Sequence, residues 1–309
     1  MKYFLIMTSL AGLLLAQRTT STATYDVNGN RVEGARFSEV RLPDGATDRR
    51  ETVQNINGQR VPIQTVDEKV VSDSGGVRVV ERLVKKFDAS GTAGPPERVR
   101  VEERKNPDGS TTTSTSVLRA DINGNYAVAE RAATITRKSG NTTSSETTVE
   151  RPTVNGSLET IEKKQETTRE LSPGNTERTA VRSARDTNGR FSEVGKEVVE
   201  VKKTGDSTVE NSAVYESTNG QLELVRQKVS RSTKRGQDED TVVDVFVPNA
   251  QGQAGSTKPQ LLQRQVVEKQ MTPNGAVETI SVQRPSGPDS SRLGPPQKVE
   301  ETVCTGKCK

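Results

Sequence analysis

Both cysteines of the chain lie within its last six residues, in the segment "VEETVCTGKCK". Cys304 and Cys308 are separated by Thr-Gly-Lys, and an isolated pair in an exported protein most simply forms a disulfide. We expect this disulfide to close a final hairpin that turns at Gly306. Cross-linking between chains and redox exchange are the alternatives. Two cysteines without histidine are too few ligands for a structural zinc site.

A second set of chemically suggestive residues is the run of Asx side chains in "DVNGN" and "DINGN". Asp26, Asn28 and Asn30 start like a calcium-binding loop, and residues 121–125 repeat the pattern. A helix-loop-helix calcium site also needs glycine at position six and a bidentate glutamate at position twelve, where this chain has Phe37. The Asx residues are therefore predicted to form hairpin turns without a metal.

The chain contains no histidine. This removes the usual general base, every His-dependent triad and the commonest zinc ligand. Carboxylates are plentiful, but no pair is set apart by a special loop or an apolar pocket that would raise a pKa. We therefore nominate no catalytic residue, cofactor or metal, and a carboxylate-based secreted hydrolase is kept only as an alternative.

Composition argues against a large apolar core and against nucleic-acid binding. Apolar residues make up 29% of the 309 residues and aromatic residues 3%, with no tryptophan, whereas ordinary globular chains are about 45–50% apolar when glycine is counted. The 45 basic and 41 acidic residues are interleaved along the chain. A nucleic-acid-binding protein would cluster its positive charge, so we expect no such partner.

The N-terminal segment "MKYFLIMTSLAGLLLAQ" is typical of a secretory signal. It has one basic residue, an apolar run and small residues before a cleavage site predicted between Ala16 and Gln17. The run is too short for a confident membrane span, which needs about 20 apolar residues. We expect residues 1–16 to be removed and the mature chain to be exported to the periplasm, cell surface or medium, without a remaining membrane span.

Glycine turns recur through the mature chain at steps of 29 to 33 residues. The marker glycines are Gly29, Gly58, Gly91, Gly124, Gly156, Gly189, Gly220 and Gly252. A second glycine turn lies midway through each unit, and β-branched residues fill the intervals, which predicts strands and not helices. Asn-Gly between such runs is a strong hairpin signal and favours type I′ turns.

The period predicts an all-β fold, an extended antiparallel meander of about 16 long strands built from a roughly 32-residue two-hairpin repeat. Residues 17–283 would form the array, and residues 284–309 a Pro/Ser-rich linker followed by the hairpin closed by the cysteines. Neither face of a strand such as "VRVVERLVKKF" is cleanly apolar, which disfavours a sandwich. We expect a single-layer sheet or a shallow solenoid whose turns fix the strand register.

The Tyr25-Asp26 pair followed by glycine turns resembles the Tyr-Asp (Rhs-type) repeats of bacterial surface and toxin-delivery proteins. The resemblance covers only a few residues of each repeat, because the tyrosine is absent from later units. It implies a β-hairpin array on a bacterial surface. The charged, Thr-rich strands are also similar in architecture to the free-standing sheet of spirochaetal outer-surface lipoproteins.

These features predict an exported, non-enzymatic repeat protein with a structural or adhesive role. Its partner would be an envelope polysaccharide or another surface protein. The main alternative is an outer-membrane β-barrel, because 16 strands of about ten residues match a porin. Such a barrel also needs an apolar lipid-facing row and aromatic girdles, which nine Phe and Tyr residues, two of them in the signal, are not expected to supply.

Overall fold

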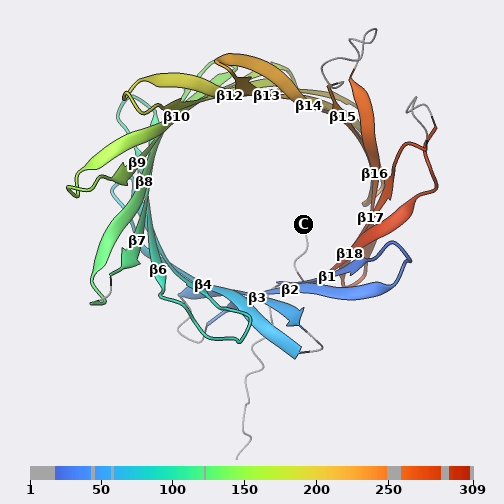
Figure 1. Ribbon diagram of the computed structural model, residues 1–309, viewed down its shortest axis with the longest axis horizontal. Coiled ribbons are helices and arrows are strands. Elements are labelled where there is room, and N and C mark those ends of the chain that lie inside the picture. The colour runs from blue at the N-terminus through green and yellow to red at the C-terminus, as the bar shows by residue number, and fades with distance from the viewer. Residues whose placement is uncertain are drawn as a thin grey trace, which may run out of the picture.

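The computed structural model describes residues 18–42, 46–56, 59–121, 123–248, 259–286 and 292–306. These residues form 18 antiparallel strands in one sheet, each paired with its neighbours in the sequence (Figure 1). Val, Thr and Ile fill the strands, as expected for a pleated and partly buried surface. Within the described ranges, no helix is long and apolar enough to cross a lipid bilayer.

The strands are long and continuous. They are β1 (Arg18–Tyr25), β2 (Arg31–Arg41), β3 (Thr47–Ile56), β4 (Gln59–Ser74), β5 (Val77–Lys86), β6 (Glu97–Lys105), β7 (Thr111–Ala120), β8 (Tyr126–Ser139), β9 (Thr142–Pro152), β10 (Leu158–Ser172), β11 (Asn175–Arg185), β12 (Phe191–Thr204), β13 (Ser207–Thr218), β14 (Gln221–Arg235), β15 (Asp238–Val247), β16 (Gln260–Thr272), β17 (Gly275–Gln283) and β18 (Gln297–Gly306).

The sheet closes on itself, because β1 pairs with β2 on one side and with β18 on the other. The expected antiparallel meander is confirmed, but the expected single-layer sheet or shallow solenoid is wrong: the molecule is a closed β-barrel of 18 strands and not about 16. Closure has a physical reason. An open sheet leaves two unpaired edges, and twisted open sheets of more than about ten strands tend to curl.

The two rims of the barrel differ. Connections from each even-numbered strand to the next strand are two to five residues long, and both ends of the sheet, Arg18 and Gly306, lie at this short-turn rim. The opposite, long-loop rim carries the connections that follow odd-numbered strands. Three of these are much longer, residues 87–96, 248–259 and 284–296. The two rims are therefore not equivalent, and both ends of the sheet lie at the short-turn rim.

The Asn-Gly turns are not generally of the expected type I′. That turn needs positive φ at both central residues, and the only described non-glycine residue with positive φ is Asn219. Asn219 and Gly220 form a two-residue turn with φ of 52° and 82°. Elsewhere the turn is different. At the first turn, for example, the carbonyl of Asp26 accepts a hydrogen bond from the amide of Gly29, and Gly29 is the turn residue with positive φ.

A β-bulge recurs near the long-loop rim. Eight of the nine hairpins that turn at this rim have a register shift, and β5–β6 is the exception. In seven of them one strand carries a single extra residue, which is apolar each time: Ile63, Ala129, Ile161, Val194, Val225, Leu262 and Val299. Bulges bend strands and increase their twist, which is what a closing sheet requires.

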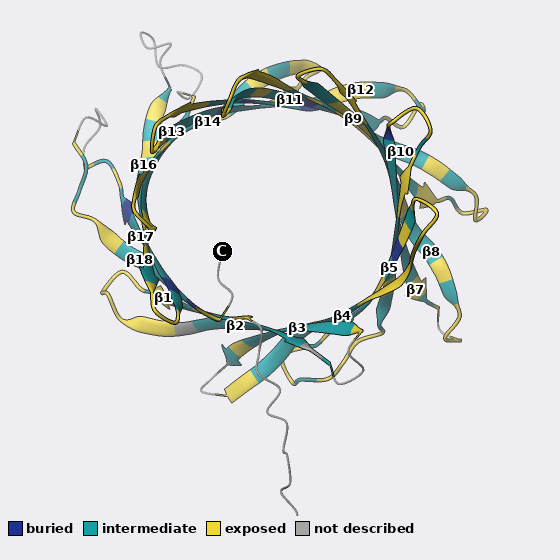
Figure 2. Ribbon diagram, turned by 180° about the vertical axis from the view of Figure 1, so that it is seen from behind, coloured by how far each residue is buried: buried dark blue, intermediate teal, exposed yellow. Residues whose placement is uncertain are grey.

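The barrel has no apolar centre. Among the described residues, no large side chain is fully buried, and the ring in Figure 2 is a mixture of intermediate and exposed residues. Cross-strand partners share a face, so register sorts every strand residue onto one of two faces. Side chains converge on the concave face and are more crowded there. We infer that the inner face is the one carrying most of the buried strand residues: Ala180, Val199, Ser212, Val245, Ala276, Val282 and Cys304.

Candidate functional site: charged faces and an aromatic belt

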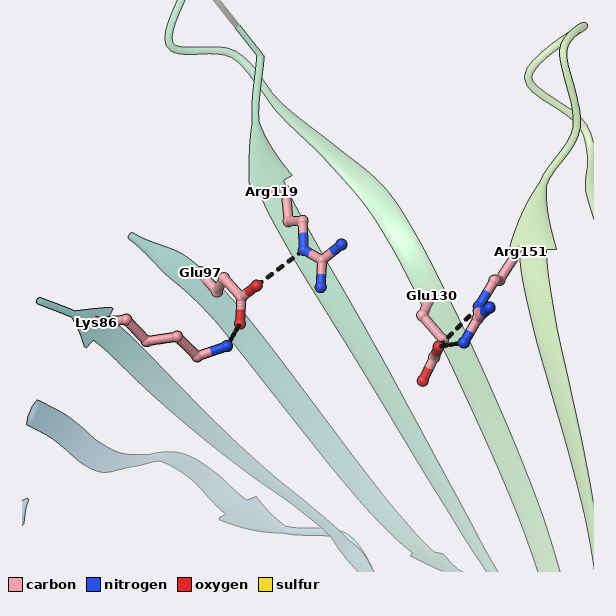
Figure 3. Close-up of polar contacts among 5 residues, drawn as sticks. All are labelled: Lys86, Glu97, Arg119, Glu130 and Arg151. Carbon is pink, nitrogen blue, oxygen red and sulfur yellow. Dashed lines mark hydrogen bonds and ion pairs between the residues drawn. The ribbon is translucent and has the colours of Figure 1, made fainter. Parts of the chain in front are cut away.

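Ion pairs run around the inner face from strand to strand. Glu97 of β6 accepts a hydrogen bond of 2.8 Å from Nε of Arg119 on β7, and Nζ of Lys86 on β5 lies 3.5 Å from its other oxygen. Further along, Arg151 of β9 donates two hydrogen bonds, of 2.8 and 3.0 Å, to Glu130 of β8. Figure 3 shows these five side chains along the same face of neighbouring strands.

The same pattern continues across β2 to β5. Arg50 forms ion pairs with Glu39 and Glu68, with nitrogen–oxygen distances of 3.1 and 3.6 Å. Arg82 forms an ion pair of 2.6 Å with the same Glu68. Four successive strands are thereby joined by alternating charges. Each pair is partly solvated, so each contributes only about 0–1 kcal/mol to stability. The more important consequence is that the inner face is wettable and nearly balanced in charge.

A third ladder joins β10, β11 and β12. Glu166 forms ion pairs with Lys164 and Arg178, with nitrogen–oxygen distances of 2.8 and 3.5 Å. Arg178 also forms an ion pair of 2.7 Å with Glu197. These residues share the inner face with the groups of the other two ladders. Cross-strand charge pairs of this kind favour one register over its neighbours, because a slip by one residue would place them on opposite faces.

The outer face carries the most buried charge of the described barrel. Asp244 of β15 has a side chain only 5% exposed, and it is held from both sides by arginines. Arg264 of β16 donates two hydrogen bonds to it, of 2.6 and 3.0 Å, and Arg231 of β14 donates one of 3.0 Å. Bidentate pairing of this kind is geometrically specific and strong. The triad therefore fixes three strands in register.

Aromatic and leucine side chains form a belt on the outer face beside the long-loop rim. We call this set the aromatic belt; it consists of Tyr25, Leu118, Tyr126, Leu158, Phe191, Tyr215, Leu222, Leu224, Phe246 and Leu261. Nine Phe and Tyr residues occur in the whole chain, two of them in the predicted signal, so five of the remaining seven lie in this belt. The belt has members on β1, β7, β8, β10 and β12 to β16, so it is an incomplete girdle at one rim, and the expectation that these residues cannot supply full girdles is not overturned.

Cations lie over three rings of the belt. The guanidinium of Arg98 is 4.1 Å from the centroid of Tyr126, and Nζ of Lys163 is 4.6 Å from that of Phe191. Nζ of Lys298 is 4.7 Å from the centroid of Tyr25. Aromatic rings accompanied by Lys or Arg are typical of surfaces that lie at a membrane–water interface.

No known protein family, curated protein or solved structure matches this chain. What the chain does must therefore be argued from its own residues. Within the part of the chain that the structure describes, no group of three or more Asp, Glu, His or Cys side chains is placed to hold a metal ion. The described faces offer charge pairs and aromatic rings for recognition, and no free strand edge, because β1 pairs with β18.

The Asp side chains of the calcium-like segments accept hydrogen bonds from the backbone of their own turns. Oδ1 of Asp26 accepts hydrogen bonds of 2.8 Å from the backbone amides of Asn28 and Asn30, and Asp121 does the same for Asn123 and Asn125 at 2.8 and 2.9 Å. The hydrogen bonds from the side chain and backbone of Asn30 lower the pKa of Asp26 below its ordinary value. For Asp121, the backbone amide of Asn125 is the main cause of a lowered pKa.

The predicted turn glycines lie at the long-loop rim wherever the structure describes them. Gly29, Gly91, Gly124, Gly156, Gly189 and Gly220 all have positive φ, between 76° and 82°. Gly58 and Gly252 lie outside the described residues, as do Ala16 and Gln17 of the predicted cleavage site. The structure brings the described glycines to one rim but not into a binding site.

Of the two cysteines, Cys304 lies among the described residues. Cys304 is a buried residue of β18, opposite Ala276 of β17 and Thr20 of β1. Cys308 lies outside the described residues, so the disulfide stays a prediction. The segment 297–306 is an integral strand of the barrel.

Sequence reasoning missed the aromatic belt and the buried Asp244 triad. The belt residues do follow a signal, because most of them stand within a few positions of a marker glycine. Two such residues separated by a turn come together when the hairpin forms. The triad has no comparable signal, since its three members lie on three successive strands, away from the turns, and meet only through the register of β14, β15 and β16.

Proposed function

We propose that the mature chain is an exported, non-enzymatic β-barrel of the outer-membrane type. The observation that carries this proposal is the closed, even-numbered antiparallel sheet whose two ends lie at the rim with short turns. Bacterial outer-membrane barrels share these properties, with short turns on the periplasmic side and longer loops outside. Barrels of 16 to 18 strands in that class enclose an aqueous channel.

The aromatic belt supports the same proposal. It lies on the outer face at the level where the longer loops begin, and three of its rings are accompanied by Arg98, Lys163 and Lys298. In a membrane barrel such a belt sits at the headgroup level. The long-loop rim would then face away from the cell, and the inner-face ion-pair ladders would line a water-filled interior.

A second candidate is favoured by the charges on the outer face. This face carries three groups of charges between the aromatic belt and the short-turn rim: the Arg49–Asp67 pair, the Arg131–Glu150 pair and the triad at Asp244. An Arg or Lys facing lipid at the bilayer midplane costs about 2–4 kcal/mol. The alternative is therefore a barrel that stands in water in the cell envelope and serves as a scaffold for an envelope polysaccharide or another surface protein.

Membrane fractionation separates the two functions. The chain is expressed with its own N-terminal segment in a Gram-negative host, and envelope membranes are washed with alkaline carbonate and with urea. An outer-membrane barrel stays in the pellet and changes its gel mobility on boiling. It also adds ion conductance to a planar bilayer. A barrel found in the soluble periplasmic fraction or medium, with no conductance, would refute the membrane proposal and support the second candidate.

A further inference from the structure

A groove of about 550 Å³ crosses the outer face of β4 to β7. Its volume lies within the range of about 300–1,000 Å³ that is usual for ligand sites. Apolar, basic and acidic side chains of the outer face line it. The apolar ones are Leu42, Leu83 and Leu118, and the basic ones are Lys69, Arg98 and Arg100.

The strand register explains how these side chains come together. Lys69, Glu81 and Arg100 are successive cross-strand partners, which makes one polar row across β4, β5 and β6. The adjacent row on the same face contains Leu83, followed by Arg98 and then Leu118. A row rich in hydrogen-bond donors therefore runs beside a row with two leucines, and the second row ends at the aromatic belt.

The acidic groups of the groove are already engaged. Asp67 accepts hydrogen bonds of 2.6 and 2.8 Å from Arg49. Glu81 lies 3.3 Å from Nη1 of Arg100, and both of these side chains are about half exposed. Lys69, Arg98 and Arg100 together outnumber Asp67 and Glu81, even before Arg49 is counted. The groove thus carries net positive charge beside two leucines, Leu83 and Leu118, between which Arg98 lies with its guanidinium over Tyr126.

We propose that this groove binds a long-chain fatty acid. The carboxylate would lie on Arg100 and Lys69, and the alkyl chain would lie over Leu83 and Leu118 toward Tyr126. A small anion would leave the leucines without a role, and an uncharged alkyl chain would leave the excess positive charge without one. The site lies on the outer face whether the barrel stands in a bilayer or in water, so it does not depend on the membrane proposal.

Binding can be measured with a fluorescent palmitate analogue added to the purified mature chain, either in detergent-free buffer or in zwitterionic nanodiscs. We expect saturable binding to one site, with displacement by palmitate. Acetate and palmityl alcohol should displace the probe poorly, because each offers only half of the required chemistry. Equal displacement by the alcohol, or no saturable binding in either preparation, would refute the proposal.

Two variants and a matched control test the residues. Arg100→Glu should weaken binding about tenfold or more, since it replaces a charge-assisted hydrogen bond by repulsion. Leu83→Thr keeps a residue suited to strands and should weaken binding of palmitate more than that of a shorter acid. Arg104→Glu is the control, because Arg104 lies on the same strand and face, has similar exposure and also pairs with a glutamate. If Arg104→Glu weakens binding as much as Arg100→Glu, the groove is not the site.

Membrane partition and fatty-acid binding are separate measurements. A chain found in the soluble fraction that still binds palmitate refutes only the membrane proposal. A chain integrated into membranes that fails to bind palmitate refutes only the groove. Circular dichroism of each variant verifies that the β-sheet has formed before binding is compared.

Discussion

The hydroxyl oxygens of Thr22 and Thr302 lie 3.1 Å apart and share a hydrogen bond, although 280 residues separate them in the chain. They belong to β1 and β18, which pair over seven residues from Arg18 to Thr24. This seam turns a meander into a barrel. An open sheet or a solenoid built from the same hairpins would hold these two threonines far apart.

Cysteines placed at this seam should cross-link within one chain. The change is Thr22→Cys with Thr302→Cys, in a background where Cys304 and Cys308 are serine. We expect rapid formation of a disulfide under mild oxidation, detected as an intramolecular bond by mass spectrometry, because directly opposed strand residues have Cβ atoms within reach. Pairing Thr22→Cys with Thr134→Cys on β8 is the control and should give no bond. A seam pair that stays reduced would contradict closure.

Loss of the Asp244 carboxylate should cost more stability than loss of the Glu97 carboxylate. Asp244 is 5% exposed and held by two arginines, whereas Glu97 is 21% exposed. We expect Asp244→Asn to lower the free energy of unfolding by about 1.5–3 kcal/mol and Glu97→Gln by at most about 1 kcal/mol. Urea unfolding followed by circular dichroism gives both values. Equal costs would mean that Asp244 is solvated in the folded protein.

Two glycines should respond differently to replacement by alanine. Gly124 has a φ of +81° and open space where a Cβ would stand, so Gly124→Ala should cost about 1–2 kcal/mol through backbone strain alone. Gly124→Asn should cost less, since asparagine tolerates that conformation. Gly275→Ala should be the most damaging, because its Cβ would overlap the backbone oxygen of Cys304. Thermal unfolding of the three variants tests this order.

Acid should weaken the turns at the long-loop rim. Hydrogen bonds within the turns hold the pKa values of Asp26, Asp88 and Asp121 below their ordinary value. A lowered folded-state pKa contributes stability that is present above the ordinary pKa of about 3.9 and is lost as the pH falls through the lower, folded-state value. The variant with all three aspartates replaced by asparagine should therefore lose less stability between about pH 4 and pH 2. If it loses as much as the natural chain, these carboxylates do not set the acid dependence.

The hairpin rhythm could be predicted from the sequence because its signals are local. A glycine such as Gly124 or Gly189 needs only its immediate neighbours to form a turn, and Val and Thr between the turns favour strands. The scarcity of apolar residues likewise predicted the absence of an apolar centre. Closure could not be predicted in this way, because it depends on the pairing of β1 with β18 and no local pattern encodes that contact.

In the strands that carry a bulge, the mixed faces have a cause that the sequence alone concealed; the faces of β5 are mixed without one. A bulge such as the one at Ala129 places two residues opposite one, so the alternation of inner and outer positions changes phase within a strand. Tyr126 and Val128 lie on the outer face before the bulge, and Arg131 and Ala133 lie there after it. A simple odd–even division of this strand assigns half of it to the wrong face.

The seam also sets an order of events during synthesis and folding. Every other strand pair joins neighbours in sequence and can form as soon as both strands have emerged. The free edge of β1 waits for β18, the last strand to be made, and until then the growing sheet exposes an edge at each end that invites association with other chains. Folding without aggregation therefore requires a factor that shields those edges, or synthesis quick enough that residues 297–306 arrive before another molecule does.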